Sequence, residues 1–300
     1  AIVSVTGASN VTGFINPVHR MAEKAHAAGA MICVDCAQLA PHRKIDMHPV
    51  DASDHLDFIS ISAHKMYAPF GTGALIGRRD FFATGDPDMV GGGEVEIVTL
   101  ETVEWSEPPD RDEAGSPNTV GAIALGAAIS ELEKIGMDVV ASHEAELTGH
   151  ILTRLSKMPY LSVYGDRNPA TAASRLGVVP LNMQGYSHYL LAAILGFEYG
   201  IGVRNGCFCA HPYLLKLMKV DDTEASKVRS TIMAKDKRDV PGLVRISFGL
   251  YNTLDEVDSL LKALEDIHAG KYQGKYHQDT ASGAFVPEGW QVDFDHYISL

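Results

Sequence analysis

The alternation of short apolar runs with a helical segment in the first half of the chain most limits its possible folds. Apolar runs cover residues 1–5, 31–35, 57–62 and 73–77, and a segment with apolar residues at helical spacing separates the first two. Strands that are apolar along almost their whole length are typical of a parallel sheet covered by helices on both faces. The first half therefore predicts an α/β domain with a mostly parallel sheet.

Residues that commonly cap helices mark where several helices begin. Asn16 and Pro17 predict the start of a first helix, and Asn118 precedes a long alanine-rich one. Thr253 and Glu256 form a capping box for the last helix. Shorter apolar runs predict strands in the second half: 161–164, 177–181 and 244–248. This half predicts a smaller α+β domain.

The chain of 300 residues is long enough for two domains. We expect a larger domain over residues 1–135, a smaller one over 136–270 and a surface tail over 271–300. The first residue is not Met, and the chain opens directly on an apolar strand. We therefore expect a fragment that lacks an N-terminal segment.

Composition excludes several classes of partner. The formal net charge of −13 argues against binding to nucleic acid or to an anionic membrane surface. No stretch approaches the roughly 20 apolar residues that a membrane helix requires. Four cysteines do not make a disulfide framework, so a cytoplasmic protein is expected.

Polar side chains follow the predicted parallel strands where ligands bind in open α/β sheets. Asn10 follows the first strand, Asp35 ends the second, and Ser62, His64 and Lys65 follow the third. Pyridoxal 5'-phosphate (PLP) requires a lysine that bonds to its aldehyde and an acidic partner for its ring nitrogen. An acid, a hydroxyl and a lysine at the ends of successive strands therefore predict a PLP site.

Further motifs make the prediction more specific. Six segments follow one another in order: DCAQ at 35–38, SAHKMYAPFGTG at 62–73, GGG at 91–93, EAGSPNT at 113–119, RNGCFCAHP at 204–212, and VRIS with YNT at 244–253. Together they resemble the class V aminotransferases, a family of fold-type I PLP enzymes. The resemblance covers about residues 1–267 and is greatest to the cysteine desulfurase and selenocysteine lyase branch.

The resemblance implies roles at the cofactor ring. Lys65 would form the Schiff base with PLP and later carry the α-proton of the substrate. Asp35 would pair with the pyridinium nitrogen, and Gln38 would hydrogen-bond the phenolic oxygen of the ring. Ala37 would pack against one ring face, and Asn10 would lie near the ring oxygen and the substrate carboxylate.

The resemblance also implies phosphate and substrate contacts. Ser62 and His64 would bind the phosphate, and Ser116 would reach a phosphate in a partner subunit, which implies a homodimer. Arg245 would clamp the substrate carboxylate, with Arg204 as a further substrate-binding residue.

Cys209 would be the nucleophile that takes the sulfur. The expected reaction removes sulfur from L-cysteine, or selenium from selenocysteine, and leaves alanine and a persulfide on Cys209. A protein could then accept the sulfur, and the sequence names neither this acceptor nor the exact substrate.

Two departures from the family pattern leave alternatives open. Many relatives carry histidines just before the nucleophile, where this chain has Cys207 and Phe208, so Cys207 is a rival nucleophile. The expected N-terminal segment would complete the PLP site. The chain could instead be another class V enzyme (an aminotransferase, epimerase or lyase) or a truncated homologue without catalysis.

No metal is expected. Cys33 and Cys36 lie in or just after a strand, where alternation points successive side chains to opposite faces, so a shared zinc is disfavoured. The thirteen histidines lack the spacing of a helical metal motif and are interpreted as surface residues or hydrogen-bonded core residues.

Overall fold

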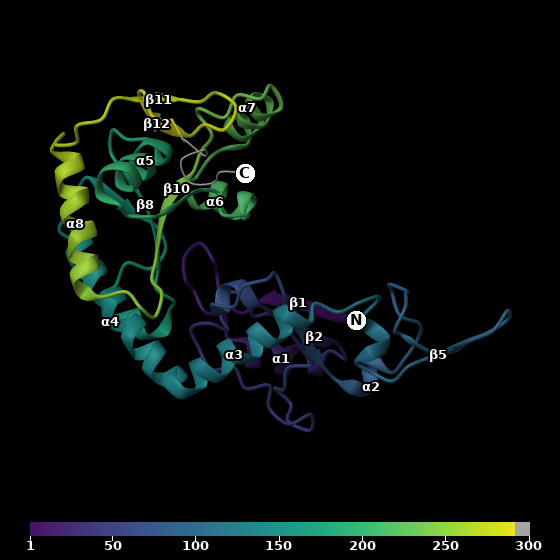
Figure 1. Ribbon diagram of the computed structural model, residues 1–300. Helices are drawn as coiled ribbons and strands as arrows, with labels where there is room; N and C mark the ends of the chain where they lie inside the picture. The colour runs from purple at the N-terminus through teal and green to yellow at the C-terminus, as the bar shows by residue number, and fades with distance from the viewer. Residues whose placement is uncertain (292–300) are drawn as a thin grey trace. The chain divides into compact units, whose positions relative to one another are not determined.

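The computed structural model describes residues 1–291 and divides them into two compact units (Figure 1). The first unit comprises Ala1–Ser9 and Ile15–Ala141. The second comprises Asn10–Phe14 and the chain from Ser142 onward. The five residues Asn10–Phe14 belong to the second unit because they bond to distant residues there. The Arg175 guanidinium donates to the Thr12 carbonyl oxygen at 2.8 Å.

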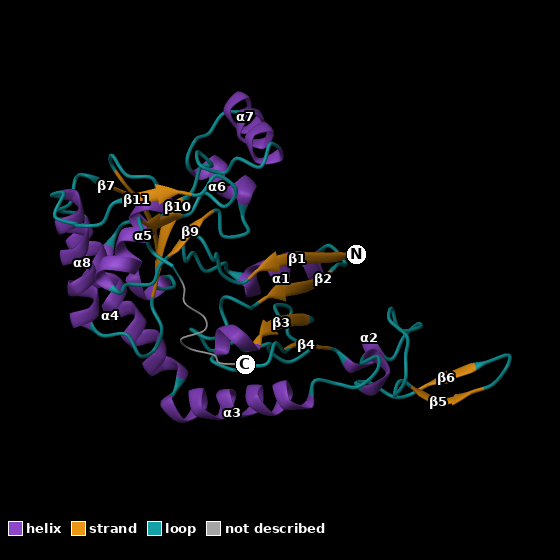
Figure 2. Ribbon diagram, turned by 45° about the horizontal axis from the view of Figure 1, so that its top comes forward, coloured by secondary structure: helices purple, strands orange, loops and turns teal. Residues whose placement is uncertain are grey.

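The first unit is built on a four-stranded sheet (Figure 2). Its strands are β1 (Ile2–Thr6), β2 (Met31–Asp35), β3 (Phe58–Ser62) and β4 (Gly73–Gly77), in that order. The first three run parallel, and β4 is antiparallel to β3. The predicted strands and the mostly parallel sheet are therefore confirmed.

Helix α1 (Val18–Ala27) packs against β1 and β2 and connects them. The prediction that Asn16 caps this helix is wrong. Pro17 occupies the cap position without a side-chain bond, and the Asn16 amide donates to the Thr6 carbonyl oxygen at 2.7 Å instead. The Asn16 side chain thus joins the end of β1 to the start of the helix.

The rest of the first unit consists of α2 (Arg79–Phe82), β5 (Val95–Val98), β6 (Val103–Trp105) and α3 (Thr119–Ile135). Strands β5 and β6 pair as a separate antiparallel hairpin. The Asn118 cap of α3 is confirmed, since its side chain accepts from the Gly121 amide at 3.0 Å.

The expectation that helices cover both faces of this sheet is wrong for its first strand. Four of the five residues of β1 are exposed, and Ile2 keeps 53% of its accessible surface. In β2, by contrast, Ile32 and Val34 are fully buried. The reason is that α1, the helix that packs on this part of the sheet, contacts β2 more extensively than β1.

The second unit contains an antiparallel sheet of β7 (Leu161–Val163), β8 (Val178–Met183), β10 (Leu243–Ser247) and β9 (Arg204–Gly206), in that order. Apolar side chains of β8 and β10 contribute to the core of this unit.

Five helices accompany this sheet: α4 (Met137–Leu155), α5 (His188–Tyr199), α6 (His211–Leu217), α7 (Asp222–Met233) and α8 (Leu254–His268). The capping box of α8 is confirmed, with both the Thr253 and Glu256 side chains bonded. No helix among residues 1–291 is long and apolar enough to cross a membrane.

The segment predicted as a surface tail over 271–300 contains a hairpin within its described part. Strands β11 (Tyr276–Gln278) and β12 (Phe285–Pro287) pair, and β12 packs against α5. No periodic pattern is visible in this segment because each strand has only three residues. The predicted tail over 292–300 lies outside the described residues.

Candidate active site

The structure places most of the expected cofactor residues along one edge of the first sheet. Asp35 is the last residue of β2 and is in register with Ser60 of the neighbouring β3. Ser62 ends β3, and a 3-10 turn over Ala63–Met66 follows it directly. Parallel strands end at the same edge of a sheet, so Asp35, Ser62 and the turn that carries Lys65 belong to the same edge.

The 3-10 turn holds Lys65 in a fixed backbone. The Ala63 amide donates to the Thr72 carbonyl oxygen at 3.0 Å, and the Ala68 amide donates to the Ala63 carbonyl oxygen at 3.0 Å. Lys65 is half-buried, whereas His64 is exposed. Lys65 is therefore less exposed in this turn than the neighbouring His64.

The chain requires a glycine at position 73, just after the turn. A Cβ added at Gly73 would lie 2.5 Å from the Ile61 carbonyl oxygen, which is closer than two such atoms approach. The glycine therefore lets β4 run close beside the end of β3, where Ser62 and Gly73 are in register.

The Asp35 carboxylate is exposed and is oriented by its own loop. Its Oδ1 accepts from the Ala37 amide at 2.9 Å, and no residue within 1–291 donates to Oδ2. Ala37 and Gln38 are half-buried beside it. A half-buried amine, a carboxylate with a free oxygen and a hydroxyl are the donor set that PLP requires, so these residues fit the expected cofactor.

Ser116 lies on an exposed loop of the first unit. The Gly115 amide donates to the Gly92 carbonyl oxygen at 2.9 Å, so this loop is tied to the glycine run over 91–93. Two of the motifs in the first half of the chain therefore meet here.

The second unit brings together a different set of expected residues. The Asn10 amide donates to the Phe208 carbonyl oxygen at 2.7 Å, and the Arg245 guanidinium donates to the Asn10 carbonyl oxygen at 2.9 Å. Arg245 also lies over the Phe208 ring, 5.0 Å from its centroid. Asn10, Phe208 and Arg245 thus form one cluster, which we call the arginine cluster.

Arg245 has a hydrogen-bond donor left over for a ligand. Its Nε is buried and has no partner among the described residues. Burial lowers the pKa of this guanidinium, and the facing charge of Arg204 on β9 lowers it further, while Cys209 opposes the shift. Arg204 is exposed. Two guanidiniums on neighbouring strands make a local positive field that suits a carboxylate.

The two cysteines of the second unit have different surroundings. Cys209 is exposed and has a positive φ of 62° at a tight turn, and it interacts electrostatically with Arg245. Cys207 is half-buried, and burial raises the pKa of its thiol. Its Sγ lies 2.8 Å from Nε2 of His211.

Sequence reasoning missed the functions of two residues in this region. Phe208 supplies both a ring for Arg245 and a carbonyl for Asn10. His211 contacts Cys207. The four-residue spacing of Cys207 and His211 was visible in the sequence, but nothing local indicated that Phe208 meets a residue nearly two hundred positions away.

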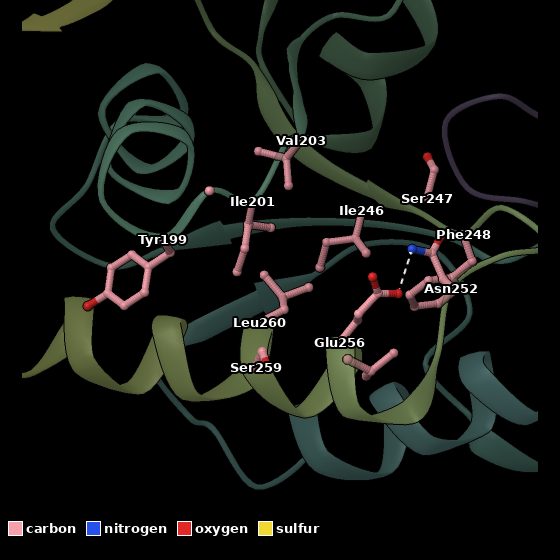
Figure 3. Close-up of a pocket in the computed structure, with 13 residues that line it drawn as sticks. Tyr199, Ile201, Val203, Ile246, Ser247, Phe248, Asn252, Glu256, Ser259 and Leu260 are labelled. Atoms are coloured by element: carbon pink, nitrogen blue, oxygen red, sulfur yellow. Dashed lines mark hydrogen bonds between the residues drawn. The ribbon is translucent and has the colours of Figure 1, made fainter.

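A separate cavity of about 360 Å³ lies in the second unit between β10, α8 and the loop after α5 (Figure 3). Tyr199, Ile201 and Leu260 line it, and none of the expected site residues does. Its polar side chains come from several elements: Tyr199 of α5, Ser247 of β10, and Asn252, Glu256 and Ser259 in and before α8, where the Asn252 amide donates to Glu256 at 3.0 Å. This cavity is therefore separate from the expected site residues.

Cys33 and Cys36 behave as structural thiols. Both are free, and burial raises the pKa of Cys36 to about 12 and shifts the pKa of Cys33 in the same direction. A thiol with such a high pKa is protonated at neutral pH and is a poor nucleophile or metal ligand.

Comparison with known proteins gives consistent matches. Residues 1–260 match the family model of aminotransferase class-V. A "Probable cysteine desulfurase" of Halalkalibacterium halodurans is 39% identical over 264 residues, which are 88% of this chain and 57% of that protein. The cysteine desulfurase of Serratia proteamaculans is 34% identical over 267 residues, 89% of this chain and 58% of that protein.

A solved structure agrees with these matches. The apo cysteine desulfurase of Thermococcus onnurineus aligns with a TM-score of 0.76 and 34% identity over 90% of this chain and 60% of that one. The chain therefore spans a little over half the length of the relatives it matches. Because the family model covers far more than half of the residues, the chain belongs to the aminotransferase class-V family.

Proposed function

We propose that the chain carries out cysteine desulfurase chemistry with PLP, removing sulfur from L-cysteine, or selenium from selenocysteine, to give alanine. The observation that carries this proposal is the position of Cys209, which is exposed and interacts with the half-buried Arg245. A nucleophile beside a carboxylate-binding cation suits a small amino acid whose side chain carries the sulfur.

The residues of the first sheet edge would hold the cofactor. Lys65 would bind its aldehyde, Asp35 would accept from its ring nitrogen, and Gln38 would donate to its ring oxygen. Ala37 would pack against the ring, while Ser62 and His64 would bind the phosphate. When bound, PLP would withdraw electrons from the substrate Cα and Cβ and so stabilise the electron pair that stays on the carbon fragment when the Cβ–S bond breaks.

Lys65 would act as the proton carrier. Lys65 is half-buried in a turn whose backbone is held by hydrogen bonds, so the start of its side chain has a defined position. It would take the α-proton of the substrate at Nζ and return a proton to the carbon skeleton before alanine leaves.

The arginine cluster would hold the substrate carboxylate. Arg245 has one buried N–H without a partner, and a carboxylate oxygen would satisfy it. Asn10 would orient the guanidinium through its carbonyl oxygen, and Arg204 would add to the positive field. The substrate would thus be fixed at its carboxylate, and its side chain would point away from the clamp.

We propose Cys209 rather than Cys207 as the nucleophile. Cys207 is half-buried and burial raises the pKa of its thiol, whereas Cys209 is exposed and interacts with Arg245. The Cys209 sulfur would bond to the substrate sulfur as the substrate Cβ–S bond breaks. The electron pair of that bond stays with the carbon fragment, which is protonated and released as alanine.

We further propose a cytoplasmic homodimer in which Ser116 reaches the phosphate bound by a partner subunit. Its place on an exposed loop is compatible with that reach. A protein that accepts the sulfur from Cys209 is also expected. Sedimentation velocity of the purified chain with PLP tests the dimer, and a single species of monomer mass would contradict it.

The test of the reaction is alanine release from L-cysteine by the purified chain with added PLP and a reductant. Lys65→Ala and Cys209→Ala should each abolish the release, while Cys207→Ser should retain it. Retained PLP without alanine would contradict the desulfurase and favour another class V reaction. Neither alanine nor PLP retention would favour a homologue without catalysis.

A further inference from the structure

Cys207 and Cys209 lie in one tight turn of the second unit, between β9 and α6. The Ala210 amide donates to the Cys207 carbonyl oxygen at 2.9 Å, which closes the turn. Its two central residues, Phe208 and Cys209, have positive φ angles of 52° and 62°. A turn with this hydrogen bond and two left-handed central residues is a type I′ turn. We call residues 207–210 the cysteine turn.

The cysteine turn is strained, and its surroundings hold it in place. Phe208 and Cys209 are not glycine, so a left-handed backbone costs free energy at both positions. The Phe208 side chain is buried, with its ring under the Arg245 guanidinium. The Phe208 carbonyl oxygen accepts from the Asn10 amide at 2.7 Å. The contacts of Phe208 therefore fix a backbone conformation that neither residue favours by itself.

This conformation brings the two cysteines close enough to join. Left-handed residues have the mirror-image geometry of an α-helix, so Cα atoms two positions apart are separated by about 5.4 Å. Cysteines joined by a disulfide have Cα atoms about 4.4–6.8 Å apart. The Cys209 amide donates to the Cys207 sulfur, and the two thiols interact electrostatically. A disulfide between Cys207 and Cys209 therefore requires little movement of the backbone.

His211 places a proton acceptor beside Cys207. It is the first residue of α6, directly after the turn, and its Nε2 lies 2.8 Å from the Cys207 sulfur. An imidazole in contact with a thiol takes the thiol proton as the sulfur forms a new bond. Cys209 is exposed, whereas Cys207 is half-buried. A small oxidant in the solvent therefore meets Cys209 first, and Cys207 lies next to it with a base at its sulfur.

We propose that Cys207 is a resolving thiol, which captures Cys209 in an intramolecular disulfide when a peroxide oxidises Cys209. The Cys209 sulfur attacks one oxygen of hydrogen peroxide, the O–O bond breaks, and Cys209 becomes a sulfenic acid while one water leaves. The Cys207 sulfur then attacks the Cys209 sulfur and the S–O bond breaks. The hydroxide leaves as water with the proton that His211 has taken. Two thiols and one peroxide thus give one disulfide and two waters.

The disulfide both protects the nucleophile and blocks it. A sulfenic acid that meets no second thiol is oxidised further to sulfinic and sulfonic acids, which a dithiol does not reduce. A dithiol does reduce the disulfide and restores both cysteines. The loss of activity on oxidation rests on the proposed function of Cys209, whereas the formation of the disulfide does not.

Cys33 and Cys36 provide a matched control in the same chain. They are also close in sequence, but Cys36 is fully buried and burial raises the pKa of both thiols. The full 300-residue chain is treated with hydrogen peroxide, unfolded and alkylated, and its tryptic peptides are measured by mass spectrometry. Peptide 205–216 contains both thiols of the cysteine turn, and peptide 25–43 contains the control pair.

We expect peptide 205–216 of the wild type to lose the mass of two hydrogens and to resist alkylation, while peptide 25–43 is alkylated at both thiols. In His211→Gln the disulfide should form at least tenfold more slowly. In Cys207→Ser, peroxide should leave Cys209 as a sulfinic or sulfonic acid. A dithiol should therefore restore alanine release in the oxidised wild type and not in oxidised Cys207→Ser.

Two results would overturn the proposal. One is a wild type whose Cys207 is still alkylated at a peroxide concentration that oxidises Cys209 in Cys207→Ser. The other is equal oxidation of the two peptides, which would mean that the cysteine turn gives its thiols no preference. A disulfide in peptide 205–216 of a chain that releases no alanine would contradict the proposed function and support the pairing of the two cysteines.

Discussion

The sheets of the two units differ in how much of their apolar surface is buried. In the second unit, five of the six residues of β8 are buried, and α8 covers the sheet with one continuous apolar face: Val257, Leu260, Leu261, Ala263, Leu264 and Ile267. In the first unit, β1 is mostly exposed, and α3 leaves Val120 and Ile123 in solvent. The second unit therefore has a core of its own, whereas much of the apolar surface of the first stays unpaired.

The two units also carry different expected site residues, those for the substrate in the second unit and those for the cofactor in the first. Arg245 of the arginine cluster lies on β10, whose neighbouring residues Val244 and Ile246 belong to the core of the second unit, and Cys209 follows β9. Lys65 and Asp35 lie at the edge of the more open sheet. The open sheet is thus the part whose order depends most on what binds to it, and the predictions that follow test this contrast.

The largest effect is expected in the core of the second unit. Leu261→Ala removes a fully buried side chain and should lower the free energy of unfolding by about 2–5 kcal/mol. Ile123→Ala, on the exposed face of α3, should change it by less than about 0.5 kcal/mol. Urea unfolding followed at Trp290 for the first variant and at Trp105 for the second measures both. Equal losses of unfolding free energy in the two variants would contradict the difference in burial between the two units.

Within the first unit, the same type of residue can be compared on neighbouring strands. Ile32→Ala on β2 should lower the free energy of unfolding by about 2–4 kcal/mol, because Ile32 has no exposed surface. Ile2→Ala on β1 should cost less than about 1 kcal/mol. A cost at Ile2 as large as that at Ile32 in urea unfolding would mean that β1 is covered in solution.

The cost of removing a helix cap should differ less between the two units than the cost of the core substitutions. Thr253→Ala removes one side of the α8 capping box and should cost about 1 kcal/mol, while Thr253→Ser should restore most of it. Asn118→Ala removes the cap of α3 and also the bond from its amide to the Phe70 carbonyl oxygen at 2.6 Å, so its cost should be larger. Thermal unfolding of the three variants checks the order.

The smallest predicted effect concerns how steeply the free energy of unfolding changes with pH. His188 is buried, donates from Nε2 to the Val240 carbonyl oxygen at 2.9 Å and accepts at Nδ1 from Asn205 at 3.3 Å. Burial lowers its pKa from 6.5. The unfolded chain therefore binds the proton more readily, so this contribution is fully present above about pH 6.5 and is lost as the pH falls through the lower folded pKa.

His188→Gln tests that sign. The free energy of unfolding of the wild type should fall between pH 7 and pH 5 more steeply than that of the variant, as measured by urea unfolding at each pH. Parallel curves would show that His188 does not titrate differently in the folded and unfolded chains.

The sequence predicted the parts of the fold that local chemistry determines. The strands over 31–35 and 73–77 have the predicted bounds because Gly29 and Ala30 precede the first and a glycine stands at each end of the second. The capping box at Thr253 needs only residues three positions apart. Both features depend on neighbours in the chain.

Prediction from the sequence was wrong or incomplete where a contact between residues far apart in the chain determines the structure. The Asn16 amide bonds to Thr6 instead of capping α1. Asn10 lies with Arg245 because residues 10–14 pack in the second unit, 235 residues from that arginine in sequence. Nε2 of His26 on α1 lies 2.9 Å from the carboxylate of Asp57, 31 residues further along the chain. No local pattern encodes contacts of this kind.

The measurement that tests the central claim most directly is the location of transferred sulfur. The purified chain is incubated with PLP and L-cysteine, its thiols are alkylated, and the peptide with both cysteines is sequenced by mass spectrometry, in the wild type and in Cys207→Ser. The proposed function predicts the added mass of one sulfur atom on Cys209 in both proteins and its loss in Lys65→Ala. Added sulfur on Cys207 alone, or on neither cysteine, would contradict it.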